Sequence, residues 1–470
     1  MLDHVAALRE LLGSKAVVVG PDAAAYEEGA RFDRGKAAFV LRPASTLEVS
    51  KAVSYCVRNG LHIVPQAGNT GVVSASTPDM SGRQVVLSVD RLAQRLELDA
   101  DNRSVRVDAG FLLSDLNAAL EPEGLFFPVD LGSNPRLGGM LATNTGGARF
   151  LKYGDVRKNT LGLTAVLADP EGTVLDFNHN LRKNNTGVDW KQVFIGTSGS
   201  FGIITECVLN VERRPKQCAT ALLVPSSTRK VMPLLRAMES RLGSYLSAFE
   251  GMSENSIKAT LEHIPGLRNP FQNGVIPHYT ILAEVTRTWD TRESEQSLDS
   301  VLENALSEIW LLDDELLSDA LLGPAHEMWA LRHALPEGVK QRGRLVAFDL
   351  AFRRGDLMNF CDRMKAEIRL RFPEVIVCDF GHVGDGGVHF NFVAERGSAS
   401  AEDPNFEREL RDWVYQVVVD EYGGSFSGEH AIGRKNQAYY DKFTTTRLKH
   451  MAKQLKAITS PAGLGVVNLG

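Results

Sequence analysis

Apolar residues along the first 214 positions come in short runs that glycine-bearing turns separate. The runs include AAFVLRP, LHIVPQ, VVLSVD, SVRVDAG, LTAVLAD and GIITECVLNV. Runs of this length, bounded by turn residues, are typical of strands. The opening segment MLDHVAALRELLG differs, because its apolar positions recur at helical spacing, and it predicts a short amphipathic helix. We therefore expect an α+β domain of many strands over residues 1–214.

The pattern changes at RRPKQ (213–217), where charge and proline predict a linker. Longer apolar runs then alternate with predicted helices near 228–241, 290–310, 315–335 and 355–371. This alternation predicts a second α+β domain, residues 215–425, built as a sheet with helices on one face. Further helices are predicted near 404–422 and 441–457. The C-terminal segment, residues 426–470, is expected to return to the first domain.

The composition is ordinary for a soluble protein and argues against several classes. The chain is 43% hydrophobic and 23% charged with a net charge of -6, and its basic residues are spread out, so we expect no nucleic-acid binding. No stretch approaches the roughly 20 apolar residues that span a bilayer, and the start lacks the features of a targeting peptide. Five cysteines without a CxxC pair argue against iron–sulfur clusters and disulfides, and predict buried thiols. A cytoplasmic protein is expected.

Three glycine-rich segments lie beside apolar runs of the first domain. They are PQAGNTG at 65–71, PVDLGSNPRLGGMLATNTGGARFLKYG at 128–154 and IGTSGSFGIIT at 195–205. Glycine lets the backbone approach a ligand closely, and successive N–H groups in such loops can bind a pyrophosphate. One such loop is more often an ordinary turn, but three in one domain predict an elongated nucleotide cofactor. No GxGxxG or P-loop sequence occurs, which argues against a Rossmann domain and a Walker-type NTPase.

The run EVIVCDFGHVGDGGVHFNFV at 374–393 predicts a β-hairpin. Its Asp-Gly pair at 385–386 is the commonest chemistry for a two-residue type I′ turn, and counting outward from it pairs His382 with His389. Cross-strand partners lie on one face with Cβ atoms about 5 Å apart, where two imidazoles can share a metal ion. Asn391 is expected on the same face.

A metal ion at this hairpin requires at least a third protein ligand. The glycine-rich segment SGEHAIG at 427–433 offers Glu429 and His430. Because these side chains are adjacent, one can bind the metal while the other stays available for chemistry.

The order of these motifs resembles a known family. The first three segments are similar to the FAD domain of the vanillyl-alcohol oxidase type. The segments GHVGDGGVHFN and SGEHAIG resemble the GHxGDGNLHxN and S-x-EH-x-[IV]-G motifs of D-lactate and D-2-hydroxyglutarate dehydrogenases, except that Gly387 and Val388 replace Asn-Leu. The resemblance covers nearly the whole chain. It implies a two-subdomain FAD-binding domain and an α+β cap whose antiparallel sheet is covered by helices.

The resemblance also implies roles for individual residues. Non-covalent FAD is implied, since Asn69 stands where several members attach FAD through a histidine. His382, His389 and Glu429 are implied to bind a divalent ion, zinc or else manganese or ferrous iron, with His430 as the base. The residues implied to lie along FAD are Pro65, Gln66, Ala67, Gly68, Asn69, Thr70, Gly71, Asp130, Ser133, Gly138, Gly139, Thr143, Asn144, Gly147, Gly199, Ile204 and Asn468.

The implied reaction is the oxidation of a small D-2-hydroxy acid, such as D-lactate, D-malate or D-2-hydroxyglutarate, with hydride transfer to flavin N5. Arg332 resembles an arginine that binds the substrate carboxylate in relatives, and Asn391 and His430 are expected beside the substrate. Pro336 and Ala347 stand where the hydroxyglutarate enzymes have a threonine and a lysine, so a second carboxylate loses expected partners. The nearby cations that offer a substitute are Lys340, Arg342 and Arg344.

The implied partners are the hydroxy acid and an electron acceptor such as an electron-transfer flavoprotein, a cytochrome or a quinone, and a homodimer is the expected assembly. Three alternatives remain at this point. They are an oxygen-using oxidase of the same fold, a non-redox flavin transferase resembling alkylglycerone-phosphate synthase, and a flavin-binding protein without catalysis. The metal ligands argue against the second and third.

Overall fold

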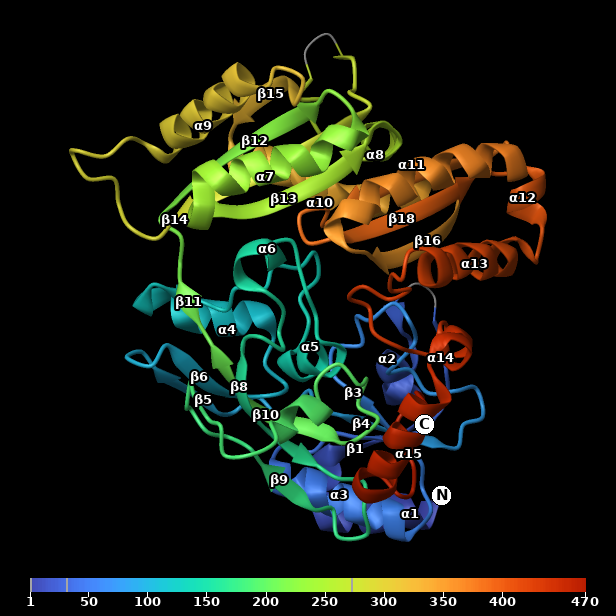
Figure 1. Cartoon of the computed structure of the whole chain (residues 1–470). Helices are drawn as coiled ribbons and strands as arrows, with labels where there is room; N and C mark the ends of the chain where they lie inside the picture. Colours follow the sequence, from blue (N-terminus) through green and yellow to red (C-terminus); the bar gives the residue numbers. More distant parts are fainter. Residues whose placement is uncertain (1, 31–32, 272–273) are drawn as a thin grey trace. The chain divides into compact units, whose positions relative to one another are not determined.

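The computed structural model describes residues 2–30, 33–271 and 274–470. Contacts within the chain define two units (Figure 1). Unit 1 comprises Met1–Gly146, Asp155–Arg214 and Glu429–Gly470, and unit 2 comprises Gly147–Gly154 and Pro215–Gly428.

The N-terminal part of unit 1 holds a four-stranded sheet in the order β1-β2-β4-β3. β2, β4 and β3 run parallel, and β1 is antiparallel to β2. Apolar side chains of α3 recur at helical spacing and are buried with Leu8 of α1 against this sheet, while Ser45 caps α3 by accepting the Glu48 N–H. The bounds are α1 Leu2–Leu12, β1 Val17–Val18, α2 Ala24–Glu27, β2 Ala37–Leu41, α3 Thr46–Arg58, β3 Ile63–Gln66 and β4 Gln84–Ser88.

A second sheet of unit 1 has five strands in the order β5-β6-β10-β8-β9, and all of its pairings are antiparallel. α4 and α5 are buried against its apolar face. The short pair β11-β7 and the C-terminal helices complete this unit. The bounds are β5 Leu96–Asp99, β6 Ser104–Asp108, α4 Leu113–Leu120, β7 Leu125–Phe126, α5 Leu137–Thr143, β8 Thr160–Val166, β9 Val174–Asp176, β10 Ile203–Asn210, β11 Glu212–Arg213, α14 Gln437–Phe443 and α15 Thr446–Thr459.

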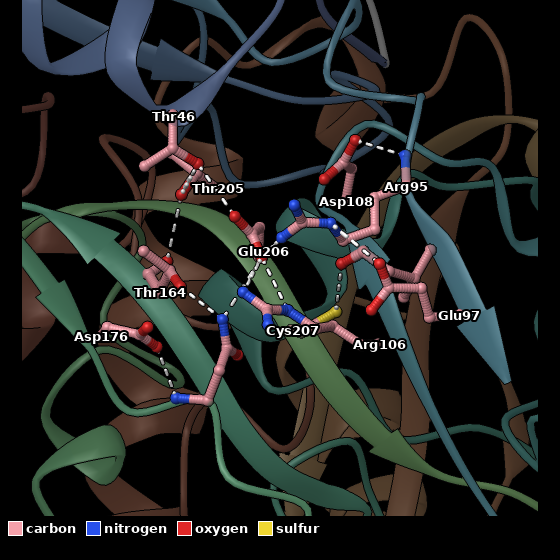
Figure 2. A network of polar contacts seen from close by, with 12 residues as sticks. Thr46, Arg95, Glu97, Arg106, Asp108, Thr164, Asp176, Thr205, Glu206 and Cys207 are labelled. Carbon is pink, nitrogen blue, oxygen red and sulfur yellow. Dashed lines mark hydrogen bonds and ion pairs between the residues drawn. The ribbon is translucent and has the colours of Figure 1, made fainter. Parts of the chain in front are cut away.

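A polar network crosses this second sheet (Figure 2). One oxygen of Glu206 on β10 accepts from Arg95 and Arg106, both at 2.8 Å, and the other accepts from Thr46 at 3.3 Å. The Glu206 side chain is only 12% exposed, whereas the arginines are 40% and 30% exposed. The carboxylate on β10 therefore ties α3 to β6 and to Arg95, which directly precedes β5.

Replacing Glu206 by alanine is expected to lower the free energy of unfolding by about 2 kcal/mol, because two guanidinium groups lose a charged acceptor. Urea unfolding followed by circular dichroism measures the change. The matched control is Glu97→Ala, which removes a 64% exposed carboxylate from the same Arg95 and should change stability by less than about 0.5 kcal/mol. Equal losses in the two variants would contradict a structural role for the buried carboxylate.

Unit 2 contains a seven-stranded sheet in the order β15-β12-β14-β13-β17-β18-β16, with antiparallel pairing throughout. A single turn of π-helix at Val417–Glu421 follows α13. The other bounds are α6 Phe150–Tyr153, β12 Gln217–Pro225, α7 Val231–Leu242, β13 Leu246–Ser253, α8 Glu254–His263, β14 Tyr279–Arg287, α9 Leu298–Leu312, β15 Leu317–Gly323, α10 Ala325–Arg342, β16 Arg344–Ala351, α11 Arg354–Arg371, β17 Val375–Gly381, β18 Gly387–Ala394, α12 Ala399–Glu402 and α13 Phe406–Gln416.

Helices pack on both faces of this sheet, which corrects the expectation of one covered face. α8 and α10 cover the face that carries Met252 and Phe380. They approach closely because a Cβ at Gly338 would lie 2.4 Å from the Cα of Thr260. On the opposite face, Phe360 of α11 packs against Phe390 of β18. The predicted α+β class with a helix-covered antiparallel sheet is confirmed.

The segment Gly147–Gly154 belongs to unit 2 although unit 1 precedes and follows it in the chain. Arg149 forms a two-pronged ion pair with Glu284 of β14, with N–O distances of 2.8 and 2.9 Å. Lys152 donates to the hydroxyl of Thr286 on the same strand at 2.7 Å. These contacts anchor the segment Gly147–Gly154 to the seven-stranded sheet.

Two other expectations need correction. The predicted helix near 315–335 is a strand, β15, followed by α10, because the segment Leu317–Gly323 pairs with β12 and forms the edge of the seven-stranded sheet. Four cysteines are buried free thiols as predicted, but Cys218 is exposed. Among the described residues, no helix is both long enough and apolar enough to cross a bilayer.

Candidate active site

β17 and β18 form the predicted hairpin, but its register differs from the predicted one. His389 pairs with Phe380 and not with His382. The connection is a longer loop in which the His382 carbonyl accepts the N–H groups of Asp385 and Gly387 at 3.1 and 3.0 Å. Hydrogen bonds to neighbouring strands hold this loop, since the N–H at 384 donates to the Phe249 carbonyl and the carbonyl at 386 accepts from 352. These tertiary contacts outweigh the local preference of Asp-Gly for a tight turn.

The two histidines are nevertheless close to each other. Their ring centroids are 5.3 Å apart, with planes inclined by 75°. Asn391 lies two residues beyond His389 on the same face, but its amide donates to the backbone carbonyls of Cys378 and His389. The structure therefore gives Asn391 a role in holding the strand pair.

Asp349 lies directly beside His389, because the two residues are cross-strand partners on β16 and β18. The N–H of Gly428 donates to the Asp349 carbonyl at 3.2 Å, and Glu429 and His430 follow at once in the chain. One ligand atom from each of Asp349, His389, Glu429 and His430 lies within 4.8 Å of the others. This group includes the predicted His389, Glu429 and His430 and excludes His382.

Asp349 was missed by the sequence analysis, although a signal exists. It is the one acidic residue in the apolar run LVAFDLAF, and it is only 8% exposed. Two carboxylates that converge on a histidine repel each other, and a divalent cation removes that repulsion. Histidine nitrogen and carboxylate oxygen are ligands that suit zinc and related ions, so the donor set fits such a cation.

A second missed residue, Glu250 on β13, connects two predicted ones. Its Oε2 accepts from Nη2 and Nε of Arg332 at 2.7 and 2.9 Å, and its Oε1 lies 2.9 Å from Nδ1 of His382. Burial raises the pKa of Glu250, but His382 and Arg332 outweigh burial and lower the pKa from 4.5 to about 2. Arg332 thus directs two of its N–H groups at a protein carboxylate.

The three glycine-rich segments meet in unit 1. A Cβ on Gly139 would lie 3.2 Å from the Cβ of Ala67, and one on Gly199 would lie 3.5 Å from the Pro65 ring. The N–H of Ser198 donates to the Ala142 carbonyl at 2.8 Å. The loop after β3 is exposed at residues 68, 70 and 71, so its backbone is accessible. Converging glycine loops with accessible backbone fit an elongated nucleotide.

The other residues predicted along FAD are spread over both units. Asp130 and Ser133 lie in the loop before α5, and Gln66 ends β3 with its amide donated to the backbone carbonyls of Tyr26 and Ser76. Asn69 has a φ of +52° and donates to the Glu28 carbonyl. The rest are placed as follows: Gly138, Thr143 and Asn144 at α5 or its C-terminal end, Ile204 buried on β10, and Gly147 in unit 2.

Asn468 occupies a different setting from these residues. It is exposed, and its side-chain oxygen accepts from Lys456 of α15 at 3.3 Å. Its N–H donates to the side chain of Gln437 at 2.9 Å. The segment around Asn468 is thus hydrogen-bonded to α14 and α15.

Comparisons with known proteins agree with this arrangement. Residues 37–178 match the FAD binding domain family, and residues 214–464 match the C-terminal domain of FAD linked oxidases. The mitochondrial D-2-hydroxyglutarate dehydrogenase of Arabidopsis thaliana is 30% identical over 467 residues, which cover 98% of this chain and 80% of that protein. A Schizosaccharomyces pombe relative whose name refers to D-lactate dehydrogenase is 31% identical over 446 residues, covering 92% and 81%.

The same fold occurs in a solved alkyldihydroxyacetonephosphate synthase, which is 17% identical with a TM-score of 0.73 and covers 98% of this chain and 85% of that one. At this identity the likeness concerns the fold alone. The relatives from Arabidopsis thaliana, Schizosaccharomyces pombe, Bos taurus and Rattus norvegicus are named as mitochondrial, so the prediction of a cytoplasmic protein is wrong. The composition carries no signal that separates these two compartments.

The two domain matches support FAD as the cofactor and an oxidoreductase as the class of protein. The identity to the curated relatives extends over more than nine tenths of the chain. The chain therefore belongs to the family of FAD-linked D-2-hydroxy-acid dehydrogenases, with an FAD-binding domain of the vanillyl-alcohol oxidase type.

Proposed function

We propose that this chain oxidises a small D-2-hydroxy acid to the 2-oxo acid, with FAD as the electron acceptor and a divalent cation at the hydroxyl group. The observation that carries the proposal is the group formed by Asp349, His389, Glu429 and His430 in a chain of an FAD-linked family. A non-redox flavin transferase, which has no substrate hydroxyl to polarise, would not need a metal-binding group of this kind.

His389 and Glu429 are the ligands that the geometry supports most directly, because they share one group within 4.8 Å. His382, whose ring centroid is 5.3 Å from that of His389, is the third ligand of the proposed site. Asp349 neutralises the cation from the neighbouring strand. A divalent cation held here, zinc in the first place, would lower the pKa of the substrate hydroxyl and fix its orientation.

His430 accepts the hydroxyl proton in this proposal. Imidazole suits the step because its free ring nitrogen can accept a proton as a general base. FAD bound at the glycine loops would accept the hydride from the substrate Cα and would carry the redox chemistry. FAD is held without a covalent bond, since Asn69 occupies the loop after β3 and its side chain is hydrogen-bonded to the protein.

Arg332 binds the substrate carboxylate with Nη1, the nitrogen it does not direct at Glu250. Arg149 is paired with Glu284, and Arg342 is paired with Glu262. Arg344 donates to the backbone carbonyls of Ser400, Ala401 and Asp403. Ala347, beside Asn391, offers no charge for a second carboxylate. Because these side chains leave no cation for a second carboxylate, they support a monocarboxylate substrate such as D-lactate over the dicarboxylate D-2-hydroxyglutarate.

Mixing the oxidised protein anaerobically with candidate acids is expected to bleach the flavin fastest with a D-monocarboxylate. The panel is D-lactate, D-malate, D-2-hydroxyglutarate, glycolate and D-mandelate, with L-lactate as the stereochemical control. Absorbance near the flavin maximum gives the rate of reduction. Faster bleaching by D-2-hydroxyglutarate would contradict the preference for one carboxylate, and no bleaching by any acid would contradict the proposed reaction.

The physiological electron acceptor is proposed to be an electron-transfer flavoprotein, a cytochrome or a quinone. Stopped-flow mixing of the reduced protein with air separates this proposal from an oxidase. Reoxidation by oxygen much slower than turnover with an artificial acceptor is the expected result.

A further inference from the structure

Glu250 stands out among the buried groups of unit 2 because it binds two functional side chains at once. It lies on β13 between Phe249 and Gly251, and its side chain is 2% exposed. One oxygen accepts both N–H groups from Arg332, and the other faces Nδ1 of His382. Both carboxylate oxygens are thus occupied, each by a residue with a proposed role in the reaction.

The contact between Glu250 and His382 fixes which imidazole nitrogen of His382 carries the hydrogen. An ionised carboxylate only accepts hydrogen bonds, so the hydrogen at the 2.9 Å contact belongs to Nδ1 of His382. In the neutral ring the lone pair then lies on Nε2, which is the atom left to bind a metal ion. A carboxylate behind a metal-binding histidine orients the ring and strengthens the ligand.

We propose that Glu250 is a positioning residue that directs His382 toward the divalent cation and holds Arg332 in place for the substrate carboxylate. This inference rests on the proposed function. One carboxylate would thereby set the relative position of the two groups that bind either end of a 2-hydroxy acid. Phe380 supports the arrangement, because the Arg332 guanidinium lies over its ring at 5.2 Å.

A second buried carboxylate on the same sheet shows that the histidine contact is particular to Glu250. Glu284 of β14 also pairs with an arginine, Arg149, and its side chain is 1% exposed. Its remaining partners are the Ser247 hydroxyl at 2.7 Å, the Trp329 indole N–H at 2.8 Å and the Cys218 thiol at 3.4 Å. Glu284 therefore shares the residue type, burial and ion pair of Glu250 without contacting a proposed metal ligand.

The test is the affinity of the full-length flavoprotein for Zn²⁺ and Mn²⁺ by competition with a chromophoric chelator. Glu250→Gln is expected to raise the Kd about 10- to 100-fold with FAD content unchanged, because the amide cannot accept from both Arg332 and His382. Glu250→Asp keeps the charge and is expected to recover part of the affinity. Glu284→Gln is the matched control, expected to lower the unfolding temperature without changing the Kd.

Several outcomes would overturn the inference. Wild-type affinity in an FAD-loaded Glu250→Gln protein is one, and an equal loss of affinity in Glu284→Gln is another. Should Glu250→Gln not fold, Glu250→Asp decides, since its retracted carboxylate should weaken binding about tenfold and unchanged affinity would refute the role. Wild-type protein that binds neither ion contradicts the proposed function itself, and this result appears before any variant is made.

Discussion

Replacing His430 by alanine is expected to lower kcat for the D-2-hydroxy acid by at least about 100-fold, the usual contribution of a positioned general base. His430 lies in the group with Asp349, His389 and Glu429, where the proposed reaction requires a base for the hydroxyl proton. Because the glycine loops that fit FAD lie elsewhere in the chain, flavin content should stay at the wild-type level. Steady-state kinetics and the visible spectrum of the purified variant give both quantities.

The matched control for this variant is His450→Ala, which removes an exposed imidazole from α15. Its kcat should equal that of the wild type. Turnover retained in His430→Ala, with FAD bound, would refute the assignment of the base. Loss of turnover together with loss of FAD would instead show that His430 supports the fold.

Complete removal of the proposed divalent cation with a strong chelator is expected to lower kcat/KM by at least about 100-fold, since Lewis-acid stabilisation of a developing alkoxide is worth several kcal/mol and each 1.36 kcal/mol is a factor of ten. Flavin should stay bound. His389→Ala should reproduce the loss without chelator, because His389 is the one histidine that belongs both to the predicted pair and to the observed group.

Adding back single ions to the metal-free protein identifies the cation. Zn²⁺, Mn²⁺ and Fe²⁺ are each compatible with two histidines and carboxylates. Elemental analysis before and after chelation shows whether removal was complete. Full activity in a protein shown to be free of metal would refute the role of the cation. Arg332 and His430 would then assist the oxidation without a metal ion.

The sequence predicts single elements well where apolar periodicity is strong. The runs that predict strands in the first domain correspond to β2, β3, β4, β6, β8 and β10, and the helix predicted near 355–371 is α11. The helix predicted near 315–335 fails over β15, because pairing with β12 at the edge of the sheet, and not local periodicity, decides the structure of Leu317–Gly323.

In the candidate site, too, the local sequence predicts some features, whereas contacts between residues distant in sequence decide the others. The hairpin motif predicts His389, and the family resemblance implies Glu429 and His430; the structure brings these three residues together. Counting outward from Asp-Gly predicts the wrong hairpin register, because the loop donates a hydrogen bond to the Phe249 carbonyl and accepts one from the Phe352 N–H. Glu250 is recognisable only as a charge within an apolar run, since its partners are 82 and 132 positions away in sequence.

The segment Gly147–Gly154 affects when each unit can complete its folding during synthesis. When the first 214 residues have left the ribosome, Arg149 has been synthesised but its partner Glu284 has not. Unit 1 meanwhile still lacks Glu429–Gly470, whose helices complete it. Neither unit can therefore finish folding during synthesis of its own first part. Nascent chains should depend on protection from aggregation until the segment Glu429–Gly470 has been synthesised.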